Sequence, residues 1–481
     1  MAQTQIEIRL KNLKEHLKKE NDILCEVVDK FIELDKIAYK LGFLNPDKQS
    51  YAIRVSWWPM ISVLGTYSAG KSTFINHYLN QPKLQRTGTH AVDDKFSVIC
   101  FGNNENVSTL PAIAIDADPR FPFYKISKEL NDVADDAEQR LDAYLQLKTC
   151  PSEKLKGKIL IDSPGFDADN QRSSTLRIAQ HIVDLSDLVL VFFDARHPEP
   201  GAMRDTLEHL VSKTLDRPDS NKFLYILNQM DITAQEDNPE EVVAAWMRAL
   251  SQTGLVTGRF YRTFNPDVCV ELPENVKERL EKKSQADMKD IHARMEQIGI
   301  ERSYRVIGML EHITKDLEQN IVPQIKRLLQ RWKRRVIWTE VSLDFIIILL
   351  AGLWFAITDN TITGTWQKLI ELGTIPLGTI TTVIFIVSLW LHLKIGDMAT
   401  NNILKQIKTE VTDEQTREGL TRAFNKNTGT WNKLFIWFVD QPVGWNRKTQ
   451  QRLNEILGSV NNYVQKLNNK FTNPSGNDKK S

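Results

Sequence analysis

One segment of the sequence carries a complete pattern for binding phosphate groups. Residues 65–72 fit the P-loop pattern GxxxxGK(S/T) at every fixed position. Gly65 and Gly70 let such a loop wrap closely, so that backbone N–H groups face the phosphates where a helix begins. Lys71 would reach the β- and γ-phosphates, and the Ser72 hydroxyl would ligate Mg²⁺. We therefore predict a nucleoside triphosphate site formed by Gly65, Thr66, Tyr67, Ser68, Ala69, Gly70, Lys71, Ser72 and Thr73.

A second phosphate-facing element, of the DxxG type, follows the apolar run at 156–161. Asp162 is placed to hold Mg²⁺ through water, and the N–H of Gly165 can sense a γ-phosphate. Ser72 and Asp162 are therefore the two candidate metal ligands.

A third element, Asn228-Gln229-Met230-Asp231, follows another apolar run and resembles the N/TKxD base-reading element of G proteins. Asp231 could accept hydrogen bonds from the ring N–H and the exocyclic amine of guanine. The Lys that usually packs along the base is Gln229 here. Asn228 and Asp231 are thus candidate nucleotide-binding residues, and Thr263, Phe264 and Asn265 stand where the last base-contacting loop is expected.

The elements that must position these residues alternate in pattern from about residue 56 to residue 265. Short apolar runs end in polar loops, and amphipathic stretches separate them. This order predicts an α/β domain with a mainly parallel sheet, which binds ligands at the carboxyl ends of its strands. Before it, residues 4–41 have the apolar spacing of one amphipathic helix.

The composition narrows the class of protein. It is 41% hydrophobic and 26% charged, which excludes a wholly disordered or fibrous chain. The net charge of +1 indicates no nucleic-acid partner, and the first twenty residues lack the apolar core of a secretory signal. The cysteines lie far apart without a CxxC pattern, which argues against a disulfide scaffold or zinc site; they are Cys25, Cys100, Cys150 and Cys269.

Two uncharged runs lie close together within residues 339–394. The run 372–393 has 22 residues, enough as a helix to cross a hydrocarbon layer of about 30 Å. The run 345–358 has 14 residues and spans only if 341–344 are included, so a re-entrant or wedge-like segment is the alternative. We predict a transmembrane helical hairpin.

Basic residues flank this hairpin. A cluster at 326–335 precedes it and Lys394 follows it, which places the nucleotide domain and both termini in the cytoplasm. The cluster could also attract anionic lipid. The aromatic stretch 434–445 could lie in a membrane interface or pack against neighbouring helices, and we favour packing.

Together these motifs resemble the dynamin superfamily, and within it the EH-domain-containing ATPases and bacterial dynamin-like proteins. The resemblance covers roughly residues 30–320 and includes GTYSAGKSTFI, IDSPG, VFFDARHP, ILNQMD, DPRFPF and the helical segment at 292–310. It implies a self-assembling, nucleotide-driven membrane-remodelling enzyme with a helical stalk built from segments on both sides of the G domain. The lipid bilayer and further copies of the chain, bound through G domain and stalk, are then the expected partners.

The resemblance also implies domain limits and a choice of nucleotide. We expect an N-terminal stalk helix (1–50), a dynamin-type G domain (51–268), a helical stalk (269–338), the hairpin (339–394), a C-terminal helical region (395–471) and a disordered tail (472–481). The sequence shows no EF-hand loop, so we expect no EH domain. The EH-domain ATPases use adenine nucleotides, which favours ATP, whereas Asn228 to Asp231 taken alone favour GTP, which we place slightly ahead.

The sequence departs from the family in its catalytic segments. Val92 and Asp93 stand where a pair of threonines is expected, and Thr87 and Thr89 lie nearby. Phe166 follows Gly165, where Ras-like enzymes have a water-positioning Gln. Dynamin relatives also lack that Gln and gain activity on G-domain dimerisation, with the Ser68 position assisting. We name Ser68, Lys71 and Thr89 as candidate catalytic residues.

The DxxG element and Asn228 to Asp231 argue against a P-loop kinase or pump motor. Two functions remain, and we favour the first. The first is a mechanochemical NTPase that assembles on its own membrane, and the apolar pair of segments is similar to that of mitofusin-like and other transmembrane members. The second is a membrane-anchored switch that recruits partners with little or no turnover, which Val92 and Asp93 favour.

Overall fold

The fold is taken from a computed structural model. It describes residues 5–87, 95–103, 106–117, 121, 143–166, 173–197, 222–234, 239–252, 259–266, 269–357 and 374–471. The chain forms two compact units. The sheet unit comprises Ile8–Leu24 and Ile53–Val306, and the helical unit comprises Met1–Glu7, Cys25–Ala52 and Ile307–Ser481.

The sheet unit is built on one mixed, mainly parallel sheet. Within the described residues its strands are β1 (Met60–Gly65), β2 (Phe96–Phe101), β3 (Ser108–Pro111), β4 (Leu145–Cys150), β5 (Ile159–Asp162), β6 (Leu188–Asp194), β7 (Phe223–Asn228) and β8 (Arg259–Arg262). Their order is β3-β4-β2-β5-β1-β6-β7-β8. The pairs β2–β5 and β3–β4 are antiparallel and the others are parallel. The predicted α/β domain with a mainly parallel sheet is confirmed.

The strands that carry the motifs end at one edge of the sheet. Val63 of β1 is in register with Asp162 of β5, and Gly65 with Phe192 of β6. Asp194 of β6 is in turn paired with Asn228 of β7. All residues of β1 and β6 are buried, as expected for central parallel strands covered on both faces.

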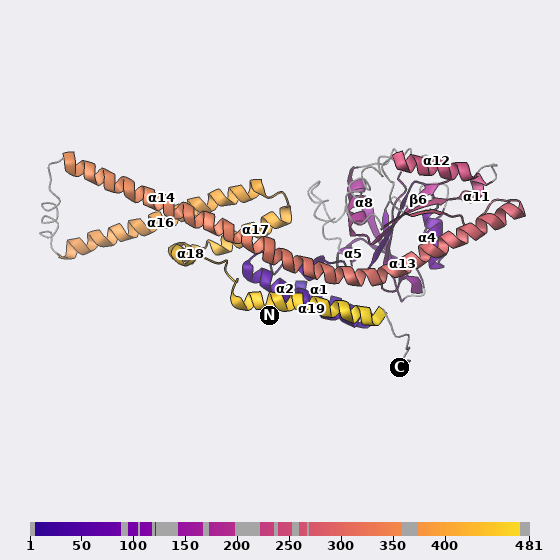
Figure 1. The fold of residues 1–481 in the computed structure, drawn as a ribbon, viewed down its shortest axis with the longest axis horizontal. Helices are drawn as coiled ribbons and strands as arrows, with labels where there is room; N and C mark the ends of the chain where they lie inside the picture. The colour runs from indigo at the N-terminus through magenta and orange to yellow at the C-terminus, as the bar shows by residue number, and fades with distance from the viewer. Residues whose placement is uncertain are drawn as a thin grey trace. The chain divides into compact units, whose positions relative to one another are not determined.

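Successive strand residues point to opposite faces, and different helices cover the two faces (Figure 1). On one face Val63 and Phe192 join a core with Phe74 of α4 (Lys71–Leu79) and Ile298 of α13 (Glu274–Asp316). On the other face Phe193 contacts Trp246 of α12 (Pro239–Gln252), with ring centroids 5.5 Å apart. In the described part of this unit the other helices are most of α1 (Gln5–Glu20), the end of α3 (Tyr51–Arg54), α5 (Ile113–Ala117), α8 (Ser173–Leu185) and α11 (Met230–Thr233).

The N-terminal helix predicted as one element is two. α1 ends at Glu20, and α2 (Asp22–Leu41) begins after Asn21. The Asn21 side-chain oxygen accepts a hydrogen bond from the Ile23 N–H at 3.2 Å, which satisfies one of the unpaired donors at the start of α2. The prediction of a single helix over 4–41 is therefore wrong.

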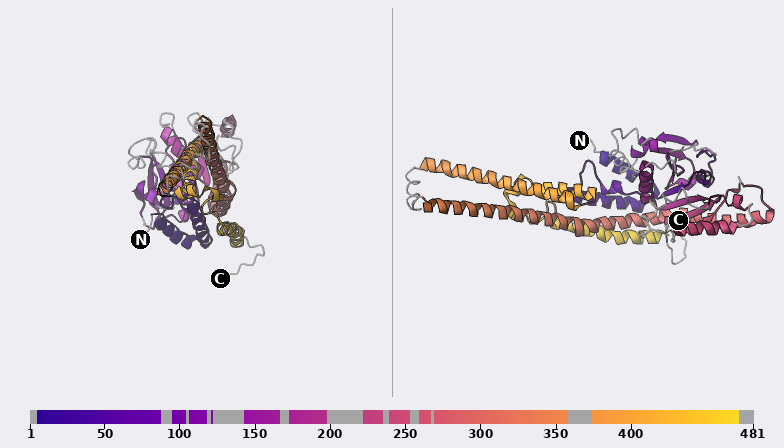
Figure 2. Two further views of the ribbon diagram at one scale, coloured as in Figure 1. Left: turned by 90° about the vertical axis from the view of Figure 1, so that its left-hand side faces the viewer. Right: turned by 90° about the horizontal axis from the view of Figure 1, so that it is seen from above.

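The helical unit contains long helices with buried apolar residues such as Trp332, Ile403 and Leu453. Its main elements are α2, α14 (Val322–Ile357), α16 (Thr374–Glu410), α17 (Glu414–Asn427), α18 (Thr430–Leu434) and α19 (Arg447–Phe471). A five-residue π-helix, η5 (Leu317–Ile321), precedes α14. The buried Trp332 of α14 donates its indole N–H to the carbonyl of Gly396 in α16, 3.3 Å away. Figure 2 shows α14 and α16 running side by side.

Among the described residues, two helical runs are long and apolar enough to cross a membrane. They are Glu274–Trp354 and Thr381–Glu410, whose most apolar windows have mean hydropathies of 2.0 and 1.5. These windows are only 6% and 11% buried, so they are not core helices of the described fold. The predicted domain limits at 50, 268, 338, 394 and 471 stay predictions, and the predicted tail at 472–481 lies outside the described residues.

Candidate functional site

The P-loop joins β1 to α4, and its two fixed glycines are required by close contacts. A Cβ on Gly65 would lie 2.6 Å from the carbonyl oxygen of Phe192 in the neighbouring strand. Gly70 has φ +84°, and a Cβ there would lie 2.2 Å from Nδ2 of Asn228. Both positions therefore disfavour any side chain, and the loop lies against Phe192 of β6 and Asn228 of β7 before α4 begins at Lys71.

Lys71 is the first residue of α4, and its side chain folds back into the P-loop. Its Nζ donates hydrogen bonds to the carbonyl oxygens of Gly65 and Thr66, each at 2.9 Å. Burial lowers the pKa of Lys71 from 10.5 to about 8, against the opposing effect of the nearby Asp162 carboxylate. The ammonium is thus held where it would meet phosphate oxygens.

The DxxG segment runs directly beside the P-loop. The N–H of Ser163 donates to the carbonyl of Val63 at 3.0 Å, and that of Phe166 donates to Gly65 at 3.3 Å. A Cβ on Gly165 would lie 2.9 Å from Cα of Tyr67, so the two loops touch at this glycine.

Asp162 is organised by residues that the sequence analysis did not select. The Gln85 amide donates to Asp162 Oδ2 at 2.7 Å, and Lys148 of β4 donates to the Gln85 side-chain oxygen. All three side chains are buried. The Lys148 ammonium is thereby linked to the Asp162 carboxylate through the Gln85 side-chain amide.

The two candidate metal ligands suit Mg²⁺ by their chemistry. Ser72 offers a hydroxyl oxygen in the first turn of α4, and Asp162 offers a carboxylate at the end of β5. Mg²⁺ prefers oxygen ligands and usually combines one or two protein groups with phosphates and water.

The third element contacts the P-loop through its first two residues. Asn228 donates through Nδ2 to the Ala69 carbonyl at 2.9 Å and accepts through Oδ1 from the Thr263 hydroxyl at 3.1 Å. Gln229, whose φ is +63°, donates through Nε2 to the Ser68 carbonyl. The residue that replaces the usual Lys is thus bound to the loop backbone.

Asp231 lies apart from these contacts. It is buried on α11, and its Oδ2 accepts a hydrogen bond from the Val270 N–H at 3.2 Å.

A pocket of about 210 Å³ lies beside the P-loop. Its lining joins the P-loop and the start of α4, through Gly70 and Thr73, to the loops that follow β7 and β8, through Asn228, Thr263 and Phe264. The structure therefore brings the expected last base-contacting loop to the P-loop.

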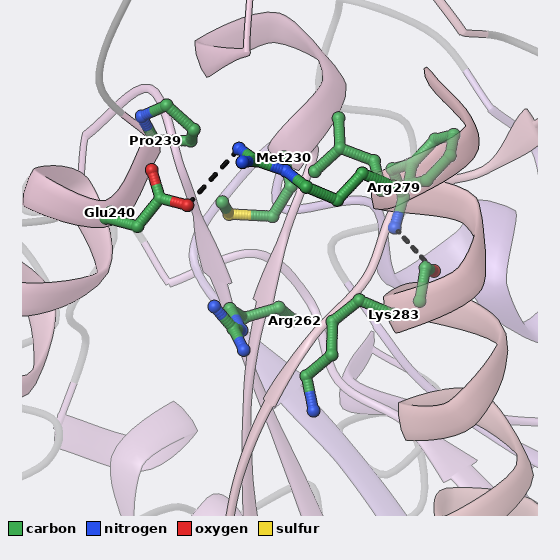
Figure 3. A pocket seen from close by; sticks show the side chains of 9 residues that line it. Met230, Pro239, Glu240, Arg262, Arg279 and Lys283 are labelled. Carbon is green, nitrogen blue, oxygen red and sulfur yellow. Dashed lines mark hydrogen bonds and ion pairs between the residues drawn. The ribbon is translucent and has the colours of Figure 1, made fainter. Parts of the chain in front are cut away.

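A second pocket of about 250 Å³ shares Phe264 and Ser284 with the first. Figure 3 shows Arg262, Arg279 and Lys283 around it, with Arg279 paired to Glu240 at 3.2 Å.

Arg196 is a charged residue at this edge that the sequence analysis did not select. It follows β6, and its guanidinium is bound to Asp194, with Nε 2.9 Å from Oδ2. Its Nη2 also donates to the Ser68 hydroxyl at 3.2 Å. These contacts place a cation beside a candidate catalytic residue of the P-loop.

Some predicted site residues lie outside the described residues. They are Thr89, Val92 and Asp93, together with most of the DPRFPF segment. Thr87 is described and exposed.

Comparison with known proteins agrees with this architecture. Residues 61–230 match the model of the Dynamin family. EH domain-containing protein 1 of Homo sapiens is 28% identical over 183 residues, which cover 36% of this chain and 31% of that protein. EH domain-containing protein 3 of Homo sapiens is 27% identical over the same length. Residues 61–230 are thus similar to the Dynamin family, and the chain spans about a third of the length of the curated relatives it matches.

Two solved structures described as an oligomerised bacterial dynamin pair also align with the chain. They cover 91% and 95% of it at 12% and 14% identity, and 86% and 80% of their own chains. Their TM-scores of 0.36 and 0.32 mark loose superpositions.

Proposed function

We propose that this chain is a membrane-anchored dynamin-like NTPase that binds and slowly hydrolyses GTP, with ATP as the alternative. It assembles through its G domain and stalk to remodel, tether or fuse a membrane. The observation that carries the proposal is the presence on one chain of the P-loop site and of two exposed apolar helices.

The proposed roles follow from the contacts around the P-loop. Lys71 would exchange its two carbonyl partners for β- and γ-phosphate oxygens. Ser72 and Asp162 would hold Mg²⁺, which neutralises charge on the phosphates when bound. Gln85 keeps the Asp162 carboxylate oriented.

The choice of GTP rests on Asp231, which follows Asn228 in the third element and is buried on α11. Asn228 ties the P-loop to Thr263, so the base-side loops and the phosphate loop form one framework. The Asp231 carboxylate, three residues after Asn228, can accept hydrogen bonds from the ring N–H and the exocyclic amine of guanine. Adenine instead presents an acceptor at its ring N1, which a carboxylate does not suit. GTP is therefore placed ahead of ATP.

Slow turnover follows from the residues around the attacking water. Phe166 is buried and offers no polar group where Ras-like enzymes place a Gln. Ser68 and Thr89 remain as candidate groups, and Arg196 would add positive charge beside Ser68. Charge of this kind stabilises the phosphoryl-transfer transition state.

The membrane part of the proposal rests on exposure and charge. Side chains such as Ile348 and Phe385 are exposed along α14 and α16, and burying them in lipid removes this apolar surface from water. The basic residues at 326–335 and Lys394 would keep the G domain and both termini in the cytoplasm and would attract anionic lipid.

A second candidate function is a membrane-anchored switch that binds nucleotide and recruits partners with little or no turnover. Val92 and Asp93 in place of the expected threonines are the observation that favours it.

Vesicle tethering separates these two functions. The purified protein is reconstituted into liposomes, and vesicle size is followed by light scattering with GTP, ATP, GDP or no nucleotide. The proposal predicts growth of the particles with one triphosphate only, and none with Lys71→Ala. Tight nucleotide binding with vesicles of unchanged size would favour the switch.

A further inference from the structure

Four aromatic side chains project from a short segment of the helical unit. The segment consists of α18 (Thr430–Leu434) and the 3₁₀ turn η6 (Ile436–Phe438). Trp431 and Phe438 are 76% and 83% exposed, and Phe435 and Trp437 are also exposed. We call these four residues the aromatic ledge. The packing against neighbouring helices that the sequence analysis favoured for 434–445 is therefore wrong for Phe435, Trp437 and Phe438.

The ledge is fixed to the base of the helix pair by polar contacts. Lys433 Nζ lies 2.5 Å from Asp397 Oδ1 of α16, and the Lys433 carbonyl lies 2.7 Å from His392 Nε2. His392 in turn pairs with Glu340 of α14. These contacts hold α18 at the level where the apolar stretches of both helices meet their charged ends.

A second set of contacts fixes the other end of the ledge. Lys333 Nζ of α14 donates to the Trp437 carbonyl at 2.8 Å and to Asp440 Oδ1 at 2.9 Å. Ile436 is buried beneath the segment, so one apolar side chain anchors it while its neighbours face outward. Contacts of Lys433 at one end of the segment and of Lys333 at the other therefore fix its backbone, with the four rings facing outward.

The surroundings indicate a lipid headgroup layer as the partner. The exposed Trp338 of α14 is two residues from Glu340, and the exposed Trp390 of α16 is two residues from His392. Lys394 Nζ lies over the Trp390 ring, 6.0 Å from its centroid. Tryptophan and basic side chains gather at the boundary between hydrocarbon and water. The ledge continues this belt away from the helix pair.

We propose that the aromatic ledge inserts into the headgroup layer of the membrane that α14 and α16 cross, as a separate contact that fixes the orientation of the helical unit. This inference rests on the membrane part of the proposed function. It adds an interfacial anchor that the apolar helices alone do not supply.

Depth measurements with single fluorescent labels test this inference. A background with Cys25→Ser and Cys269→Ser removes the half-buried thiols, and one label is introduced by Thr430→Cys, which leaves all four rings in place. A second protein carries the label at Phe438→Cys. Ile386→Cys on α16 serves as the hairpin reference, and Met247→Cys on α12 as the reference exposed to water. Quenching is compared between lipids with a spin label at the headgroup and lipids with one deep in the acyl chain.

We expect the labels at 430 and 438 to be quenched most by the headgroup spin label, and the label at 386 by the deep one. Labels at 430 and 438 that match the one at 247, while 386 is quenched, would overturn the ledge and leave the hairpin intact. A blue-shifted label at 438 that no lipid quenches would also overturn it, because protein would then cover the ledge. An unquenched label at 386 would instead refute the membrane part of the proposed function.

Discussion

The Lys71 ammonium is buried against the carbonyls of Gly65 and Thr66, and burial lowers its pKa to about 8. A triphosphate bound beside it would raise this pKa. Above about pH 8 the complex then holds one proton more than the free protein, so affinity falls as the pH rises, by up to about tenfold per pH unit. Below that pH both states are protonated, and Lys71 contributes no pH dependence.

Titration calorimetry at several pH values between 7 and 9.5, in two buffers with different ionisation enthalpies, measures this proton uptake. Affinity and proton uptake that stay constant across the range would contradict the placement of Lys71 at the phosphates.

Arg196 lends itself to a second test at the residue scale. Its guanidinium binds both Asp194 oxygens and reaches the Ser68 hydroxyl. We expect Arg196→Ala to lower kcat by about tenfold or more, since charge near the transferred phosphate is lost. Arg196→Lys should restore little, because an ammonium lacks the planar fork that makes these contacts together.

The matched control for this variant is Arg248→Ala on α12, whose side chain is exposed and binds only the Ala244 carbonyl among the described contacts. Steady-state turnover in liposomes measures both proteins. Equal kcat for Arg196→Ala and the wild type would remove Arg196 from the catalytic account.

At the scale of elements, Asp187 connects the sheet to α13. It precedes β6, and its Oδ2 accepts the Met60 N–H of β1 at 3.0 Å. Its Oδ1 accepts from Arg302 at 3.1 Å and from Arg305 at 3.0 Å. Asp187 and Arg302 are both buried, so Asp187→Ala leaves a buried guanidinium without its counter-charge and should destabilise the unit by about 3–5 kcal/mol.

Urea unfolding followed by tryptophan fluorescence measures this loss. Arg305→Ala is the control: its side chain is 36% exposed, and its removal should cost about 1 kcal/mol or less. Similar unfolding midpoints for Asp187→Ala and the control would show that the ion pair does not hold α13.

The sequence predicted β1, β5, β6, β7 and β8 because each is a short apolar run that ends in a polar loop. β2 is also mostly apolar, so the same rule could have found it, whereas β3 and β4 carry weaker signals. β4 alternates apolar and polar residues, and β3 is mostly exposed and includes Pro111. The break at Asn21 was missed because a single polar residue within a charged stretch does not interrupt the helical spacing.

The site was predictable where its residues form local motifs and was not where they meet through the fold. The P-loop, the DxxG element and Asn228 follow strands, so the strand-end rule locates them. Gln85 belongs to no local motif, because its role depends on hydrogen bonds to Lys148 and Asp162, which are distant in the sequence. Arg196 follows β6 at the same edge, and the same rule could have found it.

For the whole molecule, the average composition is that of a soluble protein, and the apolar surface is concentrated in two helices. Under the proposed function, insertion of the two helices would concentrate the P-loop domain at the membrane. Contacts between copies would then become more frequent as the surface density rises. Assembly on the membrane would thereby couple nucleotide turnover to density.

The most direct test measures GTP and ATP turnover per molecule in detergent and in liposomes at increasing protein density, with Lys71→Ala as the inactive control. The account predicts turnover of one nucleotide that rises with density in liposomes, stays low in detergent and is absent in the variant. Tight nucleotide binding with turnover that is absent, or independent of density, would contradict an assembling motor.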